Sequence, residues 1–154
     1  MTNQENNNNE ESKIKKEIPE EVISETQHTV VIDGKKISYT ATAGTMILKE
    51  EDEESGEIAK ASVFFIAYTK DDVKEEKNRP LTFSFNGGPG SSSVWLHLGV
   101  LGPRRVEMGD AGELLPRPHE LVNNDFSLLD ETDLVFIDPV STGYSRPVPG
   151  EEAG

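Results

Sequence analysis

The feature that most constrains this chain is a strand pattern that runs directly into a glycine-rich loop and then into the start of a helix. The apolar segment PLTFSF (80–85) is followed by NGGPG (86–90), and a triple serine then offers an N-cap. We expect a helix over Ser91–Leu101, ended by Gly102 and Pro103. Glycines let the backbone approach a ligand closely, and free amides at a helix start attract negative charge. The pattern therefore predicts an anion-binding loop.

Two chemistries use such a loop: cradling a phosphate, and stabilising the oxyanion formed during acyl transfer. The phosphate motif G-x-x-x-x-G-K-[ST] is absent, and Ser93 stands where the third glycine of G-x-G-x-x-G belongs. An oxyanion loop follows the third strand of α/β-hydrolases, and two or three strands precede Asn86 here. The sequence favours the oxyanion reading, with a tight turn that binds no ligand as the alternative.

Several other segments have strand patterns. β-Branched residues alternate with polar ones on both sides of Asp33-Gly34, which is typical of a hairpin. Ala61–Thr69 reads as a buried strand, as does the short run before Asp138. The acidic segment Glu50–Glu57 is expected to be a solvated loop, and 104–131 a long irregular stretch. Strands combined with a glycine loop and a helix predict an α/β fold.

Polar residues are concentrated at the amino terminus. Residues 1–27 are rich in Glu and Asn and contain almost nothing apolar, so ordering them would cost chain entropy without burial. We expect a disordered acidic tail over 1–27 and one domain over 28–154. The chain carries 15 basic and 29 acidic residues, a formal net charge of −14. This charge disfavours nucleic acid and anionic membranes as partners.

The chain contains no cysteine, which excludes disulfides, thiolate nucleophiles and cysteine-based zinc sites. His119-Glu120 does not continue into H-E-x-x-H, so we expect no metal and no cofactor. The first residues have neither a basic nor an apolar leader region, and no run of about 18 apolar residues follows. We therefore expect a cytoplasmic protein.

Four segments together resemble a known family. FNGGPGSSS, LGPRRV, NNDFS and DLVFIDPVSTGYS occur in an order and at spacings similar to the N-terminal part of the serine carboxypeptidases, which have the α/β-hydrolase fold. The resemblance covers about Val63 to Pro147. It implies a partial α/β-hydrolase sheet, comprising the N-terminal strands, the oxyanion loop and the first helix and truncated before the nucleophile elbow. The implied reaction removes C-terminal residues from a peptide with a free C-terminus, by acyl transfer.

The resemblance also assigns roles to individual residues. It implies that the Gly88 N–H is an oxyanion donor, that Asn86 and the neighbouring Gly87 bind the substrate's C-terminal carboxylate, and that Trp95 lines the pocket of the leaving residue. It further implies that the strand before Asp138 packs beside the strand that carries the nucleophile.

Three residues depart from the family pattern. Ser91 stands where many members have a cysteine. Val100 replaces a glutamate that shares a proton with the substrate carboxylate. Ser141 replaces the first glycine of IDxPxGxGxS, so its backbone is strained if that position requires a positive φ.

The family's catalytic serine lies in a G-x-S-x-G elbow and is followed by the aspartate and histidine, but the chain contains no such elbow. His97 with Ser91 or Ser92 and Asp138 is a conceivable substitute, although hydrogen-bonded packing or solvent exposure is the commoner role of such a histidine. We expect the chain alone to be inactive.

Two functional alternatives remain. One is another α/β-hydrolase, such as a proline iminopeptidase, whose H-G-G-P-G loop is similar. The other is a non-catalytic anion-binding module. Strands that lack partners should leave bare sheet edges, so we also expect oligomers or aggregates.

Overall fold

The computed structural model describes residues 19–74, 78–87 and 90–151. Its main sheet has the strand order β1-β2-β3-β7-β4, and β8 pairs beside β3. A second, two-stranded sheet joins β5 and β6. The elements are β1 (Ile23–Ile32), β2 (Lys35–Asp52), β3 (Gly56–Lys70), β4 (Leu81–Phe85), α1 (Val94–His97), β5 (Arg104–Val106), β6 (Leu121–Asn123), the 3-10 helix η2 (Leu128–Asp130), β7 (Asp133–Ile137) and β8 (Arg146–Pro147). The fold is a mostly-strand mixed sheet with few helices.

The predicted hairpin around Asp33-Gly34 is confirmed. Both turn residues have positive φ, 47° and 73°, as a two-residue type I′ turn requires. β1 starts at Ile23, which pairs with Gly44 of β2. The expected boundary at residue 27 was therefore wrong, because residues 23–27 continue the antiparallel ladder. The prediction for residues 1–18 lies outside the described residues.

The acidic segment Glu50–Glu57 is mostly strand, so the prediction of a loop over its whole length was also wrong. β2 continues to Asp52 and β3 begins at Gly56, which leaves only a three-residue turn. Ion pairs flank this turn, because Lys49 contacts Glu57 at 2.8 Å and Lys60 contacts Glu50 at 3.1 Å. These lysines offset part of the negative charge of this segment. Their ion pairs lie where β2 and β3 pair next to the turn.

β7 lies inside the sheet. It pairs antiparallel with β3 and parallel with β4, in a register that places Phe85 opposite Ile137. Within the described residues, β1 and β4 are the edge strands of this order, and β7 has no open edge. The expectation that a nucleophile strand would lie beside β7 was wrong, because β7 already has a neighbour on each side.

The predicted helix is much shorter than expected. α1 covers only Val94–His97 of the expected Ser91–Leu101. At Gly99 and Gly102 the backbone comes so close to the carbonyl oxygens of Trp95 and His97 that a Cβ would collide with them. These two glycines let the chain fold back in a tight turn where a longer helix would otherwise continue. No helix within the described ranges has the length and apolar character needed to cross a bilayer.

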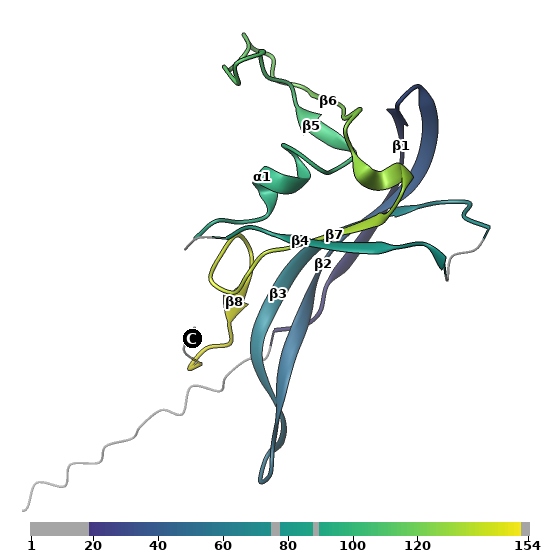
Figure 1. The fold of residues 1–154 in the computed structure, drawn as a ribbon. Coiled ribbons are helices and arrows are strands. Elements are labelled where there is room, and N and C mark those ends of the chain that lie inside the picture. The colour runs from purple at the N-terminus through teal and green to yellow at the C-terminus, as the bar shows by residue number, and fades with distance from the viewer. Residues whose placement is uncertain (1–18, 75–77, 88–89, 152–154) are drawn as a thin grey trace, which may run out of the picture.

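The core occupies one face of the sheet. Figure 1 shows α1 and the β5–β6 pair on the same side of the strands. Leu96 and Leu101 from the α1 region and Leu129 from η2 pack onto the core face. The buried core residues are Val30, Ile32, Ile37, Tyr39, Tyr68, Leu129, Leu134 and Phe136. On β4, Thr82 and Ser84 pair with core residues of β7, so the intervening apolar residues of β4 point to the opposite face and are exposed.

Candidate active site

Asn86 and Asp138 leave the sheet at the same edge, the one formed by the carboxyl ends of β4 and β7. β4 and β7 are parallel and end in register, so the residues that follow them emerge side by side at the carboxyl ends of the two strands. Asn86 is half-buried, and Gly87 is exposed, with room for a Cβ. Gly90 has φ 80°, a conformation that favours glycine. Gly88 lies outside the described residues, so its role as an oxyanion donor stays a prediction.

The carboxylate of Asp138 joins two segments at this edge. Only 3% of the residue is exposed. Its Oδ1 accepts hydrogen bonds from the backbone N–H and the hydroxyl of Ser93, both at 2.8 Å, and its Oδ2 accepts one from the N–H of Tyr144 at 3.2 Å. Hydrogen bonds to an ionised acceptor are stronger than neutral ones. The start of α1 and the loop after β7 are thereby attached to one buried side chain.

The loop after β7 depends on close packing. Ser141 has φ 69°, so this position does adopt the strained conformation considered for it. Gly143, with φ 47°, packs so closely on the Asp138 carboxylate and on Ser92 that a Cβ could not be accommodated. Ser145 donates its hydroxyl to the Asp138 carbonyl at 2.6 Å and accepts from the Phe64 N–H at 2.8 Å. The loop is held by the sheet at one end and by Asp138 in the middle.

Two aromatic side chains stand exposed on these segments. Trp95, the second residue of α1, is 67% exposed. Tyr144 is also exposed, and its ring lies 5.2 Å from that of Phe64. Trp95 is thus available to line a ligand pocket, as its expected role requires. Val100 is exposed in the turn after α1.

His97 has a packing role. It is 7% exposed, its Nδ1 lies 3.3 Å from the hydroxyl of Tyr68, and its ring packs against Phe136. Burial lowers the pKa of His97, and the negative charge of Asp138 opposes that shift in part. The described residues show no hydrogen bond from His97 to Ser91, Ser92 or Asp138, so the substitute triad is not assembled.

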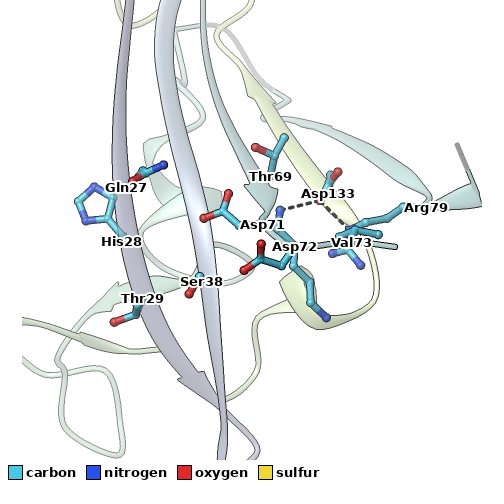
Figure 2. A pocket seen from close by; sticks show the side chains of 11 residues that line it. Gln27, His28, Thr29, Ser38, Thr69, Asp71, Asp72, Val73, Arg79 and Asp133 are labelled. Atoms are coloured by element: carbon cyan, nitrogen blue, oxygen red, sulfur yellow. Dashed lines mark hydrogen bonds and ion pairs between the residues drawn. The ribbon is translucent and has the colours of Figure 1, made fainter. Parts of the chain in front are cut away.

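The structure also contains an open cavity of about 910 Å³ at the other edge of the sheet (Figure 2). Asp133, at the start of β7, accepts hydrogen bonds there from the Lys70 N–H at 3.0 Å and from Arg79 Nε at 2.7 Å. Asp133 and Asp138 lie at opposite ends of β7, so this cavity is separate from the glycine loop. Within the described ranges, no group of three or more acidic or histidine side chains is placed to hold a metal ion.

Ser93, Tyr144 and Ser145 were not singled out as site residues from the sequence. Ser93 entered only as part of the triple serine and as the residue that interrupts a phosphate motif, and its hydroxyl caps no helix amide because Asp138 accepts it. The run IDPVSTGYS (137–145), which places Gly143 and Ser145 shortly after Asp138, is the signal that could have pointed to this hydrogen-bonded loop.

Comparison with known proteins identifies the family of this chain. The family model described as serine carboxypeptidase matches residues 51–152, about two thirds of the chain, including both segments that Asp138 joins. The chain belongs to the serine carboxypeptidase family.

Similarity to individual proteins agrees with this family assignment. The pheromone-processing carboxypeptidase KEX1 of Saccharomyces cerevisiae is 35% identical over 104 residues, which are 67% of this chain and 13% of that protein. Serine carboxypeptidase-like 37 of Arabidopsis thaliana is 34% identical over 98 residues, 61% of this chain and 18% of that protein. The crystal structure of the yeast prohormone-processing carboxypeptidase Kex1(Δ)p superimposes with a TM-score of 0.51 over 68% of this chain and 20% of that one. The chain thus spans at most about a fifth of the length of these relatives.

Proposed function

We propose that this chain forms the N-terminal part of an α/β-hydrolase domain of serine carboxypeptidase type, and that it supplies half of the oxyanion hole. The observation that carries the proposal is the shared edge at which Asn86 and Asp138 leave two parallel strands. Binding sites of open α/β sheets lie at the carboxyl ends of strands. The family membership of residues 51–152 supports assigning carboxypeptidase chemistry to this edge.

In the proposed reaction, a serine from outside this sequence attacks the carbonyl of the last peptide bond. A histidine accepts the serine proton and passes it to the leaving amine, and an aspartate orients that histidine. The Gly88 N–H and the N–H after the serine bind the oxyanion, while Asn86 and Gly87 hold the substrate carboxylate and Trp95 flanks the leaving residue. The chain lacks the G-x-S-x-G elbow, so we propose that it is inactive alone.

The test has two arms. The purified chain is assayed with an N-blocked dipeptide that has a free carboxylate, and we expect no turnover above background. Residues 51–152 are also grafted in place of the matching segment of yeast KEX1, and this chimera should hydrolyse the dipeptide. Gly88→Pro, which removes the N–H, should lower kcat of the chimera about 100- to 1,000-fold, the usual loss for one oxyanion donor.

The controls separate this proposal from its rivals. Hydrolysis by the chain alone that Gly88→Pro abolishes would refute inactivity in isolation. Saturable micromolar binding of a nucleotide by the chain, without binding of a peptide carboxylate, would favour an anion-binding module. Comparing the dipeptide acid with its amide in the chimera measures recognition of the free carboxylate, and Val100→Glu should strengthen any preference for the acid.

A further inference from the structure

The carboxylate of Asp138 bridges the two segments that flank the proposed site. Its Oδ1 holds Ser93, at the start of α1, and its Oδ2 holds Tyr144, in the loop after β7. Ser93 and Asp138 are 45 residues apart in the sequence, so this contact depends on the tertiary fold. From these contacts we propose that Asp138 is a positioning residue, which sets the two segments relative to each other for the acyl transfer proposed above.

The hydrogen bonds of Asp138 support this role. The carboxylate accepts three of them while 3% exposed, and within the described residues none comes from a lysine or arginine. Two of its donors are backbone N–H groups, so the side chain fixes main-chain positions directly. Leaving a buried carboxylate without such donors costs folding free energy, and so does leaving the donors without an acceptor. The arrangement therefore strongly favours one relative placement of the two segments.

The surroundings leave the carboxylate little freedom. Gly143 packs directly on the Asp138 side chain and on Ser92, with no room for a Cβ. The backbone of Asp138 is fixed as well, because its N–H donates to the Phe64 carbonyl at 3.0 Å and its own carbonyl accepts the Ser145 hydroxyl at 2.6 Å. A carboxylate held this firmly transmits the position of β7 to both segments.

The consequence for the proposed site is preorganisation. Ser93 fixes the exit of the glycine loop, and the pairing of Phe85 with Ile137 fixes its entry. Trp95 follows Ser93 by two residues, so its placement depends on the same contact. Asp138 acts through these neighbours and not on a reacting atom, and preorganised donors are what oxyanion stabilisation requires.

The experiment is hydrogen–deuterium exchange by mass spectrometry on the full 154-residue chain at low micromolar concentration. In Asp138→Ala, peptides that contain Ser93–His97 and peptides that contain Tyr144 should both exchange about tenfold faster, while β1–β2 peptides keep the wild-type rate. The matched control is Asp133→Ala, which removes a hydrogen-bonded aspartate from the other end of β7. It should leave both segments at the wild-type rate.

The alternatives give different results. In Asp138→Ala, which removes both acceptor oxygens, faster exchange in only one segment would overturn the proposal, because the segments would then be positioned independently. Equal acceleration everywhere in a folded Asp138→Ala chain, including β1–β2, would also overturn it, since Asp138 would then support only global stability. If Asp138→Ala does not fold, Asp138→Asn retains one acceptor oxygen and should protect one segment while the other loosens. Wild-type rates in both segments of Asp138→Asn would overturn the proposal.

This exchange experiment needs no substrate, so it is independent of the hydrolysis test. Coupled loosening of the two segments alongside an inactive chimera would leave Asp138 as a positioning residue and refute the proposed reaction. An active chimera in which Asp138→Asn lowers kcat about tenfold or more with little change in KM would support both.

Discussion

At the scale of single residues, Ser141 carries the clearest backbone strain of the site. Its φ of 69° lies in the left-handed region that side chains disfavour. For a residue with a Cβ, this conformation costs about 1–2 kcal/mol of folding free energy, a cost that glycine avoids. The greater flexibility of glycine in the unfolded chain offsets about 0.5–1 kcal/mol of that gain. We expect Ser141→Gly to raise the free energy of unfolding by about 0.5–1 kcal/mol, measured by urea denaturation. Ser141→Ala keeps the Cβ and should bring no gain, and a gain equal to that of glycine would contradict the strain argument.

The buried imidazole of His97 makes a prediction about pH. Burial lowers its pKa in the folded chain, so the unfolded chain binds a proton more readily. The free energy of unfolding should therefore decrease as the pH falls below about 6.5, the ordinary histidine pKa, toward the lower value in the folded state. His97→Gln keeps a polar partner for Tyr68 but cannot titrate in this range, so its stability should fall less between about pH 7 and pH 5.

Urea denaturation at each pH measures this dependence. The matched control is His119→Gln, which changes an exposed histidine and should retain the slope of the parent chain. Identical slopes for the parent and His97→Gln would show that protonation of His97 does not contribute.

At the scale of elements, Arg79 connects three parts of the fold. Its guanidinium donates to the Asp133 carboxylate of β7 at 2.7 Å and to the backbone carbonyls of Asp130 and Leu129 in η2. Its side chain is 9% exposed. Arg79→Met would remove the guanidinium donor of the Leu129 carbonyl, while Asp133 and Asp130 would keep only their weaker hydrogen bonds from Lys70. Losing these charge-assisted bonds should cost about 2–3 kcal/mol of unfolding free energy.

Urea denaturation of Arg79→Met measures this cost. Lys49→Met is the comparison, because it removes an ion pair whose partners are both well exposed. The loss for Lys49→Met should be much smaller. Equal losses would show that burial of Arg79 does not determine its contribution.

The sequence predicted elements whose signals are local. The hairpin at Asp33-Gly34 could be read because its two turn residues specify a type I′ turn by themselves. The helix was predicted too long. The close approach of the backbone at Gly99 and Gly102 to preceding carbonyls depends on the turn geometry and not on hydrophobic periodicity. The start of β1 was missed because the mostly polar segment from Ile23 onward forms a strand through its pairing with β2, which its own sequence does not indicate.

The candidate site was predictable only in part, for a related reason. Asn86 and Asp138 could each be placed at a strand end from local pattern, and their adjacency follows from the parallel pairing of β4 with β7. The hydrogen bonds from Ser93 to Asp138 could not be predicted. Nothing local distinguishes Ser93 from the two serines before it, because the contact forms across 45 residues of sequence.

At the scale of the whole molecule, one face of the sheet is covered and the other presents apolar side chains. Phe83 and Phe85 of β4 are 58% and 64% exposed and lie beside Val135 and Ile137 of β7. Within the described residues, β4 also has an unpaired edge. An apolar face next to an open edge is a surface on which strands of another chain can pair.

We therefore expect the 154-residue chain to self-associate at micromolar concentration, measured as a concentration-dependent sedimentation coefficient. Replacing Phe83 and Phe85 together by Glu should shift the chain toward monomer, because charges on this face oppose its burial. Phe126→Glu is the control, since Phe126 is the same residue type and even more exposed but lies in the loop before η2, away from β4. It should leave association unchanged. A parent chain that sediments as a monomer at all concentrations and melts cooperatively would show that the open face and edge do not drive association.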